Sequence, residues 1–296
     1  MPLLTEVTAV SEHLGIKGIY PIVLSNRGNF IVHLAPYPIV ARVVKLFDGD
    51  DPNFWREIWL KELKVTDRLK ERGIPVVPYS SLLPPGPHKV ADTWMTFWEY
   101  VEPAFFLSID LKQALNMVNE LASGMSDFGG GLPRLGAWRN VHQAYGHLST
   151  VGHDERIAKL LLAYQQVNEQ IISKALYPAH GDAHRQNLLT SSTGWRWIDF
   201  EDVSLMPQFW DLASVIANTA LLHGLTTPEV RHAFATVNTV AEKKSLQFAM
   251  KARCVMSTMM NLSLALQGHA DLKFACAQLD RVSDFLIALN QGGVWE

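Results

Sequence analysis

A run of polar side chains between apolar segments constrains the fold of this chain most strongly. His180 to Asn187 reads HGDAHRQN, and two leucines follow directly. Ser191 to Gly194 is rich in turn-forming residues, and Trp195 to Phe200 reads as a strand. We therefore expect a polar loop followed by a β-hairpin. Such a hairpin folds the chain back and brings Asn187 and Asp199 side by side.

The two oxygen-bearing side chains at the ends of this hairpin suit a hard cation. An amide oxygen and a carboxylate are ligands that Mg²⁺ accepts, and Mg²⁺ takes few protein ligands, so phosphate oxygens can complete its shell. Asp182 lies earlier on the same loop, where it is placed to accept a proton from a hydroxyl nucleophile. A phosphoryl-transfer site requires this order of base, metal-binding amide and metal-binding carboxylate.

The same loop has a second interpretation as a metal cluster, because His180, Asp182 and His184 bring possible ligands together. A hydrolytic zinc site needs further ligands, and the histidines between residues 142 and 153 are the nearest supply. This hypothesis gives the asparagine and the hairpin aspartate no role, so phosphoryl transfer is favoured. We expect the two loop histidines to hold the loop by hydrogen bonds.

The first hundred residues read as strands with one helix. Phe30 to Phe47 predicts a hairpin, because β-branched and aromatic residues flank two prolines. A helix is predicted from Asp51, an N-cap followed by proline, to Gly73. Glu62 lies in its apolar stripe, where a carboxylate is unfavourable unless a cation from the neighbouring sheet pairs with it. The alternative is that Glu62 lies at the stripe's edge and reaches solvent.

From Asp110 onward the sequence is mainly helical. The predicted helices span residues 110–128, 154–175, 209–223, 227–243 and 245–290, the last with breaks. A sheet-rich part joined through Trp98–Val101 to a larger helical part predicts two lobes, residues 1–100 and 101–296.

Asp127 to Gly129 spells the metal-binding tripeptide of protein kinases but precedes the polar loop, so we interpret it as a helix end. Glu201 and Asp202 are interpreted as solvated or structural, and the alternative is a role in metal binding or in attracting a cationic substrate.

These motifs resemble those of the aminoglycoside phosphotransferase and choline kinase family. HGDAHRQN is similar to the family's H-x-D-x-x-x-x-N loop, and IDFED to the aspartate motif that follows it. The resemblance implies an α+β, bilobal protein-kinase-like fold, with a small antiparallel sheet lobe carrying one helix and a larger, mainly helical lobe. It implies a kinase that moves the γ-phosphoryl group of ATP or GTP to a small-molecule hydroxyl, with Mg²⁺ as cofactor and Asp182 as the catalytic residue.

The resemblance also implies roles for residues outside the loop. VARVVKL is similar to the family's strand with the phosphate-contacting cation, which is Arg42 here, and Glu62 is then its acidic partner. The other residues implied to bind the nucleotide are Trp98, Glu99, Tyr100, Val101, Ser25 and Asn26. The residues implied to hold the metal are Asn187 and Asp199, and those implied to support the loop are His180 and Asp211 of FWDLASV.

Composition excludes several other functions. With 26 basic and 29 acidic residues the net charge is -3, so no overall positive field attracts nucleic acid or an anionic membrane. No segment reaches the roughly 18 apolar residues of a membrane helix, and the N-terminal sequence does not resemble a secretory leader. With only Cys254 and Cys276 in the chain we expect no disulfide framework, and the cytoplasm is the expected compartment.

The acceptor and the assembly are left open by the sequence. The candidate acceptors are an aminoglycoside-like antibiotic, an amino alcohol, a sugar or a related metabolite, and the chain is expected to be a monomer or homodimer. Residues 223–254 are net basic, which does not favour a polycationic aminoglycoside. The competing class of function is a catalytically silent, kinase-like ligand-binding protein.

Overall fold

The computed structural model describes residues 2–26, 28–46, 49–102, 104, 109–224 and 234–290. By packing, the chain divides into two compact units. The sheet unit comprises Met1–Leu107, Phe128–Gly130 and Gln186–Glu201, and the helical unit comprises Ser108–Asp127, Gly131–Arg185 and Asp202–Glu296. The polar loop and the hairpin after it therefore fall into different units. The division into lobes 1–100 and 101–296 stays a prediction.

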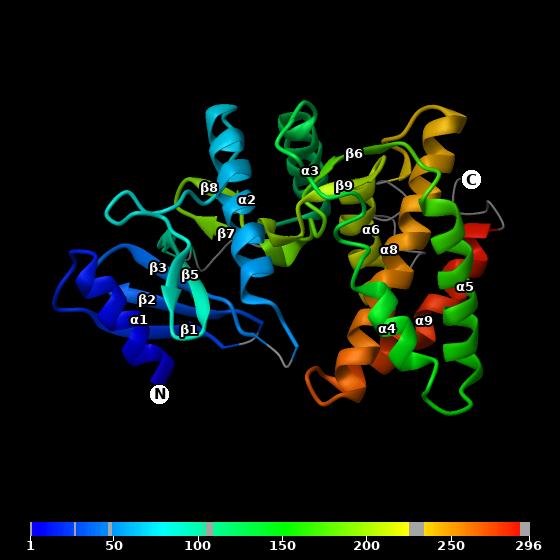
Figure 1. The fold of residues 1–296 in the computed structure, drawn as a ribbon. Coiled ribbons are helices and arrows are strands. Elements are labelled where there is room, and N and C mark those ends of the chain that lie inside the picture. Colours follow the sequence, from blue (N-terminus) through cyan, green and yellow to red (C-terminus); the bar gives the residue numbers. More distant parts are fainter. Residues whose placement is uncertain are drawn as a thin grey trace. The chain divides into compact units, whose positions relative to one another are not determined.

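The sheet unit is built on a five-stranded antiparallel sheet in the order β1-β2-β3-β5-β4 (Figure 1). Its strands are β1 (Tyr20–Ser25), β2 (Phe30–Ala35), β3 (Ile39–Val43), β4 (His88–Val90) and β5 (Thr93–Glu99). The hairpin predicted from residues 30–47 is confirmed as β2 and β3. Its register pairs Phe30 with Val43 and Ile31 with Arg42. Because strand side chains alternate, Arg42 faces the side of the sheet opposite to Phe30.

In its described residues the sheet unit has two α-helices, α1 (Pro2–His13) and α2 (Pro52–Glu71). The start of α2 is as predicted, because the Asp51 side chain accepts the N–H of Asn53 at 2.9 Å. The expectation of one helix is wrong, because α1 is a second one. Its apolar residues pack with the core of the sheet, and these are Leu3, Leu4, Val7, Val10 and Leu14 together with the segment after the helix. Their helical spacing was readable in the sequence.

The predicted hairpin after the polar loop is also confirmed. It consists of β7 (Leu188–Ser191) and β8 (Gly194–Trp197), between the short 3-10 helices η1 (Arg185–Asn187) and η2 (Phe200–Asp202). Trp197 attaches the hairpin to the segment after α2, because its N–H donates to Pro75 at 2.8 Å and its carbonyl accepts from Val77 at 3.0 Å. Through these two bonds the hairpin packs with the segment after α2 and belongs to the sheet unit.

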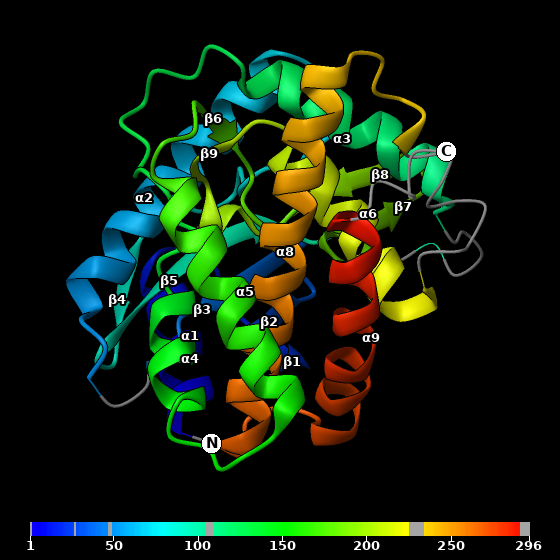
Figure 2. The ribbon, with the colours of Figure 1, turned by 90° about the vertical axis from the view of Figure 1, so that its right-hand side faces the viewer.

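The helical unit is organised around its longest helix, α8, which packs against α4, α5, α6 and α9 (Figure 2). The helices are α3 (Leu111–Met125), α4 (Val141–Leu148), α5 (Glu155–Ile171), α6 (Trp210–His223), α8 (Val240–Leu266) and α9 (Leu272–Asn290). A short antiparallel ladder joins β6 (Leu176–Ala179) to β9 (Ser204–Pro207). The tripeptide Asp127 to Gly129 follows the end of α3, as predicted for a helix end.

Most of the predicted helices of this unit are confirmed, with small shifts at their ends. The predicted helix 227–243 lies partly in residues 225–233, outside the described residues. Its predicted end is wrong, because Val237–Thr239 is not helical and α8 runs from its N-cap Thr239 through residues 243–245 without a break. The short α4 and the β6–β9 ladder were not predicted. Among the described residues, no helix is long and apolar enough to cross a membrane.

Candidate active site

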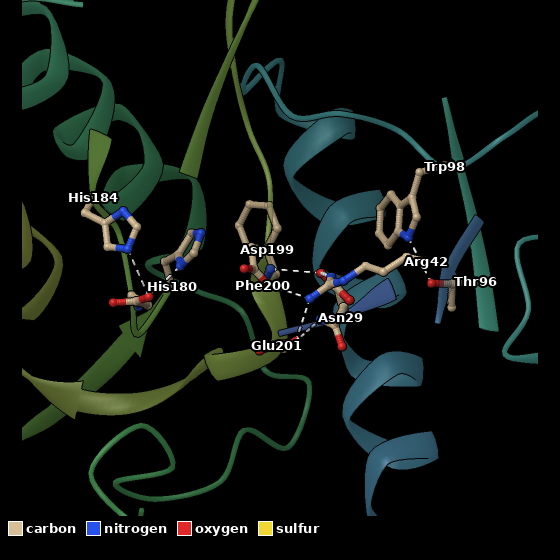
Figure 3. A network of polar contacts seen from close by, with 11 residues as sticks. Asn29, Arg42, Thr96, Trp98, His180, His184, Asp199, Phe200 and Glu201 are labelled. Carbon is tan, nitrogen blue, oxygen red and sulfur yellow. Dashed lines mark hydrogen bonds and ion pairs between the residues drawn. The ribbon is translucent and has the colours of Figure 1, made fainter. Parts of the chain in front are cut away.

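Arg42 is buried and is the centre of an ion-pair cluster in the sheet unit (Figure 3). Its Nη1 donates to Glu62 Oε1 at 2.7 Å, and its Nη2 donates to Asp199 Oδ1 and to Glu201 Oε2 at 2.5 Å each. The guanidinium also lies over the ring of Trp59, 5.6 Å from its centroid. Glu62 is 1% exposed, so it is a paired core carboxylate and does not reach solvent. The cation that its place in α2 required is Arg42.

The charges of this cluster keep Arg42 ionised and leave an excess of negative charge. Burial alone lowers the pKa of Arg42, but the charges of Glu62, Asp199 and Glu201 outweigh it and raise that pKa above its ordinary value. Three carboxylates facing one guanidinium give a formal charge of 1 − 3 = −2. In addition, Glu62 Oε2 is buried without a hydrogen-bond partner among the described residues. The carboxylates of this cluster thus outnumber the one cation that they share.

Glu62 also fixes the chain at Asp199. The same Oε1 that accepts from Arg42 accepts the backbone N–H of Phe200 at 2.9 Å. Asp199 has φ 70°, a left-handed conformation that aspartate adopts more readily than most residues. Strained backbone of this kind is held by its surroundings and concentrates at functional sites. The helix α2 thus positions both the cation and the carboxylate of the cluster.

Asn187 and Asp199 lie at the open end of the β7–β8 hairpin. The Asn187 carbonyl accepts the N–H of Ile198 at 3.0 Å, and Asp199 is the next residue. Asn187 is buried. The predicted juxtaposition is therefore confirmed at the level of the backbone, and the donor set of one amide and one carboxylate fits Mg²⁺.

An apolar cavity of about 520 Å³ lies within the sheet unit and has the Arg42 cluster in its wall. Its size is that of a small-molecule or cofactor site. The predicted nucleotide-site residues in its wall are Arg42, Glu62, Trp98, Glu99, Tyr100 and Val101. The remaining wall is mostly apolar and includes Leu24, Ile31, Val40, Val77, Leu189 and Ile198.

The turn between β1 and β2 meets this cavity through different residues than predicted. Gly28 and Asn29 line the cavity, whereas Ser25 ends β1 and the carbonyl of Asn26 accepts from Lys45 Nζ at 2.8 Å. Asn29 Nδ2 donates to Glu201 Oε2 at 3.0 Å (Figure 3). The sequence predicts a turn here, but it does not predict which residues of the turn line the cavity.

Two aromatic side chains, Trp98 and Tyr100, line another part of the cavity. Trp98 Nε1 donates to Thr96 Oγ1 at 2.9 Å, and the indole packs with Leu63 (Figure 3). Tyr100 stacks on His33 with ring centroids 3.8 Å apart. Apolar and aromatic walls of this kind suit a heteroaromatic ring.

The polar loop of the helical unit is held from below by Asp211. Its Oδ2 accepts the N–H of His180 at 2.8 Å, and its Oδ1 accepts the N–H of Gly181 at 3.1 Å. His180 is fully buried, and its Nδ1 accepts the N–H of Asp182 at 3.3 Å. Gly181 has φ 92°, and a Cβ there would collide with the carbonyl of Asp202. His180 and Asp211 thus hold the loop through its backbone.

The carboxylate of Asp182 is engaged on both oxygens. Arg253 Nη2 donates to Oδ1 at 2.7 Å. His184, labelled in Figure 3, has its Nε2 3.2 Å from Oδ2. Burial raises the pKa of Asp182, but the hydrogen bond from His184 and the charge of Arg253 outweigh it and hold the pKa well below its ordinary value. Asp182 is therefore a carboxylate at any physiological pH. Arg253 was not predicted. Its place within the apolar segment AMKARCVM was a signal of a buried charge that needs a partner.

The zinc interpretation finds no cluster in the described part of the chain. There, no group of three histidine, cysteine, aspartate or glutamate side chains is placed to hold a metal ion. His184 contacts Asp182 and so serves as a loop contact. Cys254 is buried, and Cys276 is half-buried.

The model of the phosphotransferase enzyme family matches residues 109–243. No curated protein matches the chain in sequence. Solved structures match over nearly the whole chain. Choline kinase LicA from Streptococcus pneumoniae is 12% identical with a TM-score of 0.67, and 96% of this chain and 98% of that chain are covered.

Two further structures show the same fold. An aminoglycoside phosphotransferase from Alicyclobacillus acidocaldarius is 15% identical with a TM-score of 0.56, covering 99% of this chain and 97% of that one. The amicoumacin kinase hAmiN, in complex with AMP-PNP, Ca²⁺ and Ami, is 12% identical with a TM-score of 0.68, covering 97% and 93%. The chain therefore has the protein-kinase-like fold of these small-molecule kinases, and residues 109–243 carry the pattern of the phosphotransferase enzyme family, as the sequence motifs predicted.

Proposed function

We propose that this chain transfers the γ-phosphoryl group of ATP or GTP to a hydroxyl group of a small molecule. The family match supports phosphotransferase activity. The observation that carries the proposal is the Arg42 cluster in the wall of the apolar cavity. It joins a permanent cation, an excess of carboxylate charge and a slot for a heteroaromatic ring within one unit.

The nucleotide would bind in this cavity of the sheet unit. Trp98, Val101 and their apolar neighbours would enclose the base, and Arg42 would contact the phosphates. Asn187 and Asp199 would hold Mg²⁺, which supplies neutralisation of phosphate charge when it is bound. The hydrogen bonds between Arg42 Nη2 and the carboxylates of Asp199 and Glu201 would be exchanged in part for phosphate oxygens. Glu62 would keep its bond to Nη1 and so hold the guanidinium in place during this exchange.

The hydroxyl acceptor would be oriented by Asp182. Because this carboxylate stays ionised, it accepts a hydrogen bond from the hydroxyl and takes its proton as the new bond to phosphorus forms. A carboxylate with a low pKa is a weak base, which is sufficient when bond breaking to the leaving group runs ahead of nucleophilic attack. Asp211 and His180 would keep the loop in place without touching the acceptor.

The acceptor is proposed at the level of its chemical class. The similar structures are a choline kinase, an amicoumacin kinase and an aminoglycoside phosphotransferase. We propose a hydroxyl compound of the amino alcohol, sugar or antibiotic type, phosphorylated in the cytoplasm by a monomer or homodimer.

A screen for acceptor-dependent ADP release tests this proposal. The purified chain with Mg·ATP, and separately with Mg·GTP, is incubated with panels of amino alcohols, aminoglycosides and sugars. We expect one panel to raise nucleoside diphosphate release at least about tenfold above the rate with water as acceptor. If Mg·ATP and Mg·GTP bind tightly but neither turns over with any acceptor or with water, the chain is a silent binding protein.

A further inference from the structure

Arg253 reaches the polar loop from α8 through two separate donors. Its Nη2 donates to Asp182 Oδ1 at 2.7 Å, and its Nη1 donates to the carbonyl of Gly181 at 3.1 Å. The guanidinium lies over the ring of Trp210, 5.5 Å from its centroid, and Trp210 Nε1 donates to the same carbonyl at 2.8 Å. All of these groups belong to the helical unit. The planar fork of Arg253 thus sets the position of a side chain and of the backbone before it.

This arrangement is poorly explained as a device for stability. The Arg253 side chain is only 4% exposed, and its Nε is buried without a hydrogen-bond partner among the described residues. Desolvation of a buried ion pair offsets much of its attraction, so apolar residues of similar size are often as stable. The buried guanidinium keeps one donor without a partner. Its presence is better explained by the two groups that its other donors hold, the Asp182 carboxylate and the carbonyl of Gly181.

The second oxygen of Asp182 is held separately. His184 Nε2 lies 3.2 Å from Oδ2, while Arg253 binds Oδ1. A carboxylate held at both oxygens, from the loop itself and from α8, cannot rotate about its last bond. Displacement of a reacting group by about 1 Å can lower a rate about a hundredfold, so this rotation matters for transfer.

We propose that Arg253 is a positioning residue for phosphoryl transfer, which acts by fixing the orientation of the Asp182 carboxylate. The inference rests on the proposed function. Arg253 touches no reacting atom in this account, and acts through Asp182 and the carbonyl of Gly181. Burial raises the pKa of Asp182, and the charge of Arg253 acts with the hydrogen bond from His184 to lower it.

The test compares Arg253→Met and Arg253→Lys with the native chain, using Mg·ATP hydrolysis with water as acceptor. For Arg253→Met we expect kcat to fall about tenfold or more, with KM for ATP changed less than about twofold. Arg253→Lys keeps the charge and loses the planar fork, so it should recover only part of kcat. The control is Arg281→Met, because Arg281 Nη1 bonds the carbonyls of Leu221 and Leu222 at 2.6 Å each and leaves the loop alone.

The pH profile supplies a readout that a merely structural role would not move. The charged and titratable groups around Asp182 are His184 beside it, Arg253 on α8, and His180 with Asp211 beneath the loop. A carboxylate with a depressed pKa is active above that pKa, so loss of Arg253 raises the pKa and moves the acid limb of kcat to higher pH. Arg253→Lys and Arg281→Met should leave the limb near that of the native chain.

The outcomes separate this inference from the proposed function. If the native chain neither hydrolyses Mg·ATP nor phosphorylates any acceptor, the proposed function fails. If the native chain is active and Asp182→Asn is not, while folded Arg253→Met keeps kcat within about twofold and its acid limb, the inference alone is wrong. If Arg253→Met does not fold by circular dichroism, Arg253→Lys decides, and a kcat within about twofold of native contradicts the inference.

Discussion

At the scale of single residues, one acidic side chain organises much of the sheet unit's candidate site. Glu62 accepts from Arg42 and from the backbone of Phe200 through the same oxygen. The sequence predicted the need for a cation at Glu62, because the carboxylate lies in an apolar helical stripe. It did not predict that Arg42 also binds Glu201, since Glu201 was interpreted as solvated or structural and the contact depends on the fold.

Replacing Glu62 should therefore affect both stability and nucleotide binding. Glu62→Ala leaves Arg42 buried with one partner fewer, and loss of one member of a buried pair costs about 3 kcal/mol of unfolding free energy. Urea unfolding measures this loss, and titration with Mg·ATP measures the accompanying fall in affinity. Glu57→Ala on the exposed face of the same helix is the control and should change stability by less than about 0.5 kcal/mol. Equal effects of both variants would contradict the account.

The role of Asp199 in metal binding is testable by the same kind of titration. A ligand that binds only the folded chain stabilises it by about 2.7 kcal/mol at a concentration of 100 Kd. We expect Mg·ATP to raise the melting temperature of the native chain well above the effect of ATP alone. In Asp199→Asn the two effects should become equal, because the carboxylate that holds the metal is gone. A full Mg²⁺-dependent shift in this variant would show that Asp199 is not a ligand.

At the scale of elements, the segments with strong local signals were predicted and those without were not. The start of α2 was readable because a cap and a proline mark it, and the β2–β3 hairpin was readable from its β-branched runs. The four-residue strands β6 and β9 were missed because each is too short for a pattern and forms only by pairing with the other. The α1 helix was missed although its apolar spacing was present.

The cap of α2 gives a quantitative check at this scale. Asp51→Ala removes the acceptor for the Asn53 N–H and should lower the unfolding free energy by about 1 kcal/mol. Asp51→Asn retains a capping oxygen and should stay close to the native value. Because α2 carries Glu62, the affinity for the nucleotide can also fall in Asp51→Ala. The loss of binding free energy should be no larger than the loss of unfolding free energy. An alanine variant as stable as the native chain would show that the helix start is not held by this cap.

At the scale of the whole molecule, the sequence predicted the fold class and the family pattern of residues 109–243, and it did not predict the contact from α8 to the loop. The loop and hairpin motifs are local, so sequence order alone revealed them. Arg253 lies 71 positions from Asp182, and the tertiary packing of α8 brings it to the loop. The acceptor class remains a proposal because no comparable local motif encodes it.

The most direct test of the central claim is the Asp182→Asn variant, assayed for phosphoryl transfer and for Mg·ATP affinity in parallel. Asparagine keeps the shape of the side chain and removes the acceptor charge that orients the hydroxyl. We predict a fall in kcat of about a hundredfold or more, with Kd for Mg·ATP within about threefold of the native value, because the nucleotide contacts belong to the sheet unit. A folded Asp182→Asn variant that transfers phosphate at a near-native rate would contradict the account.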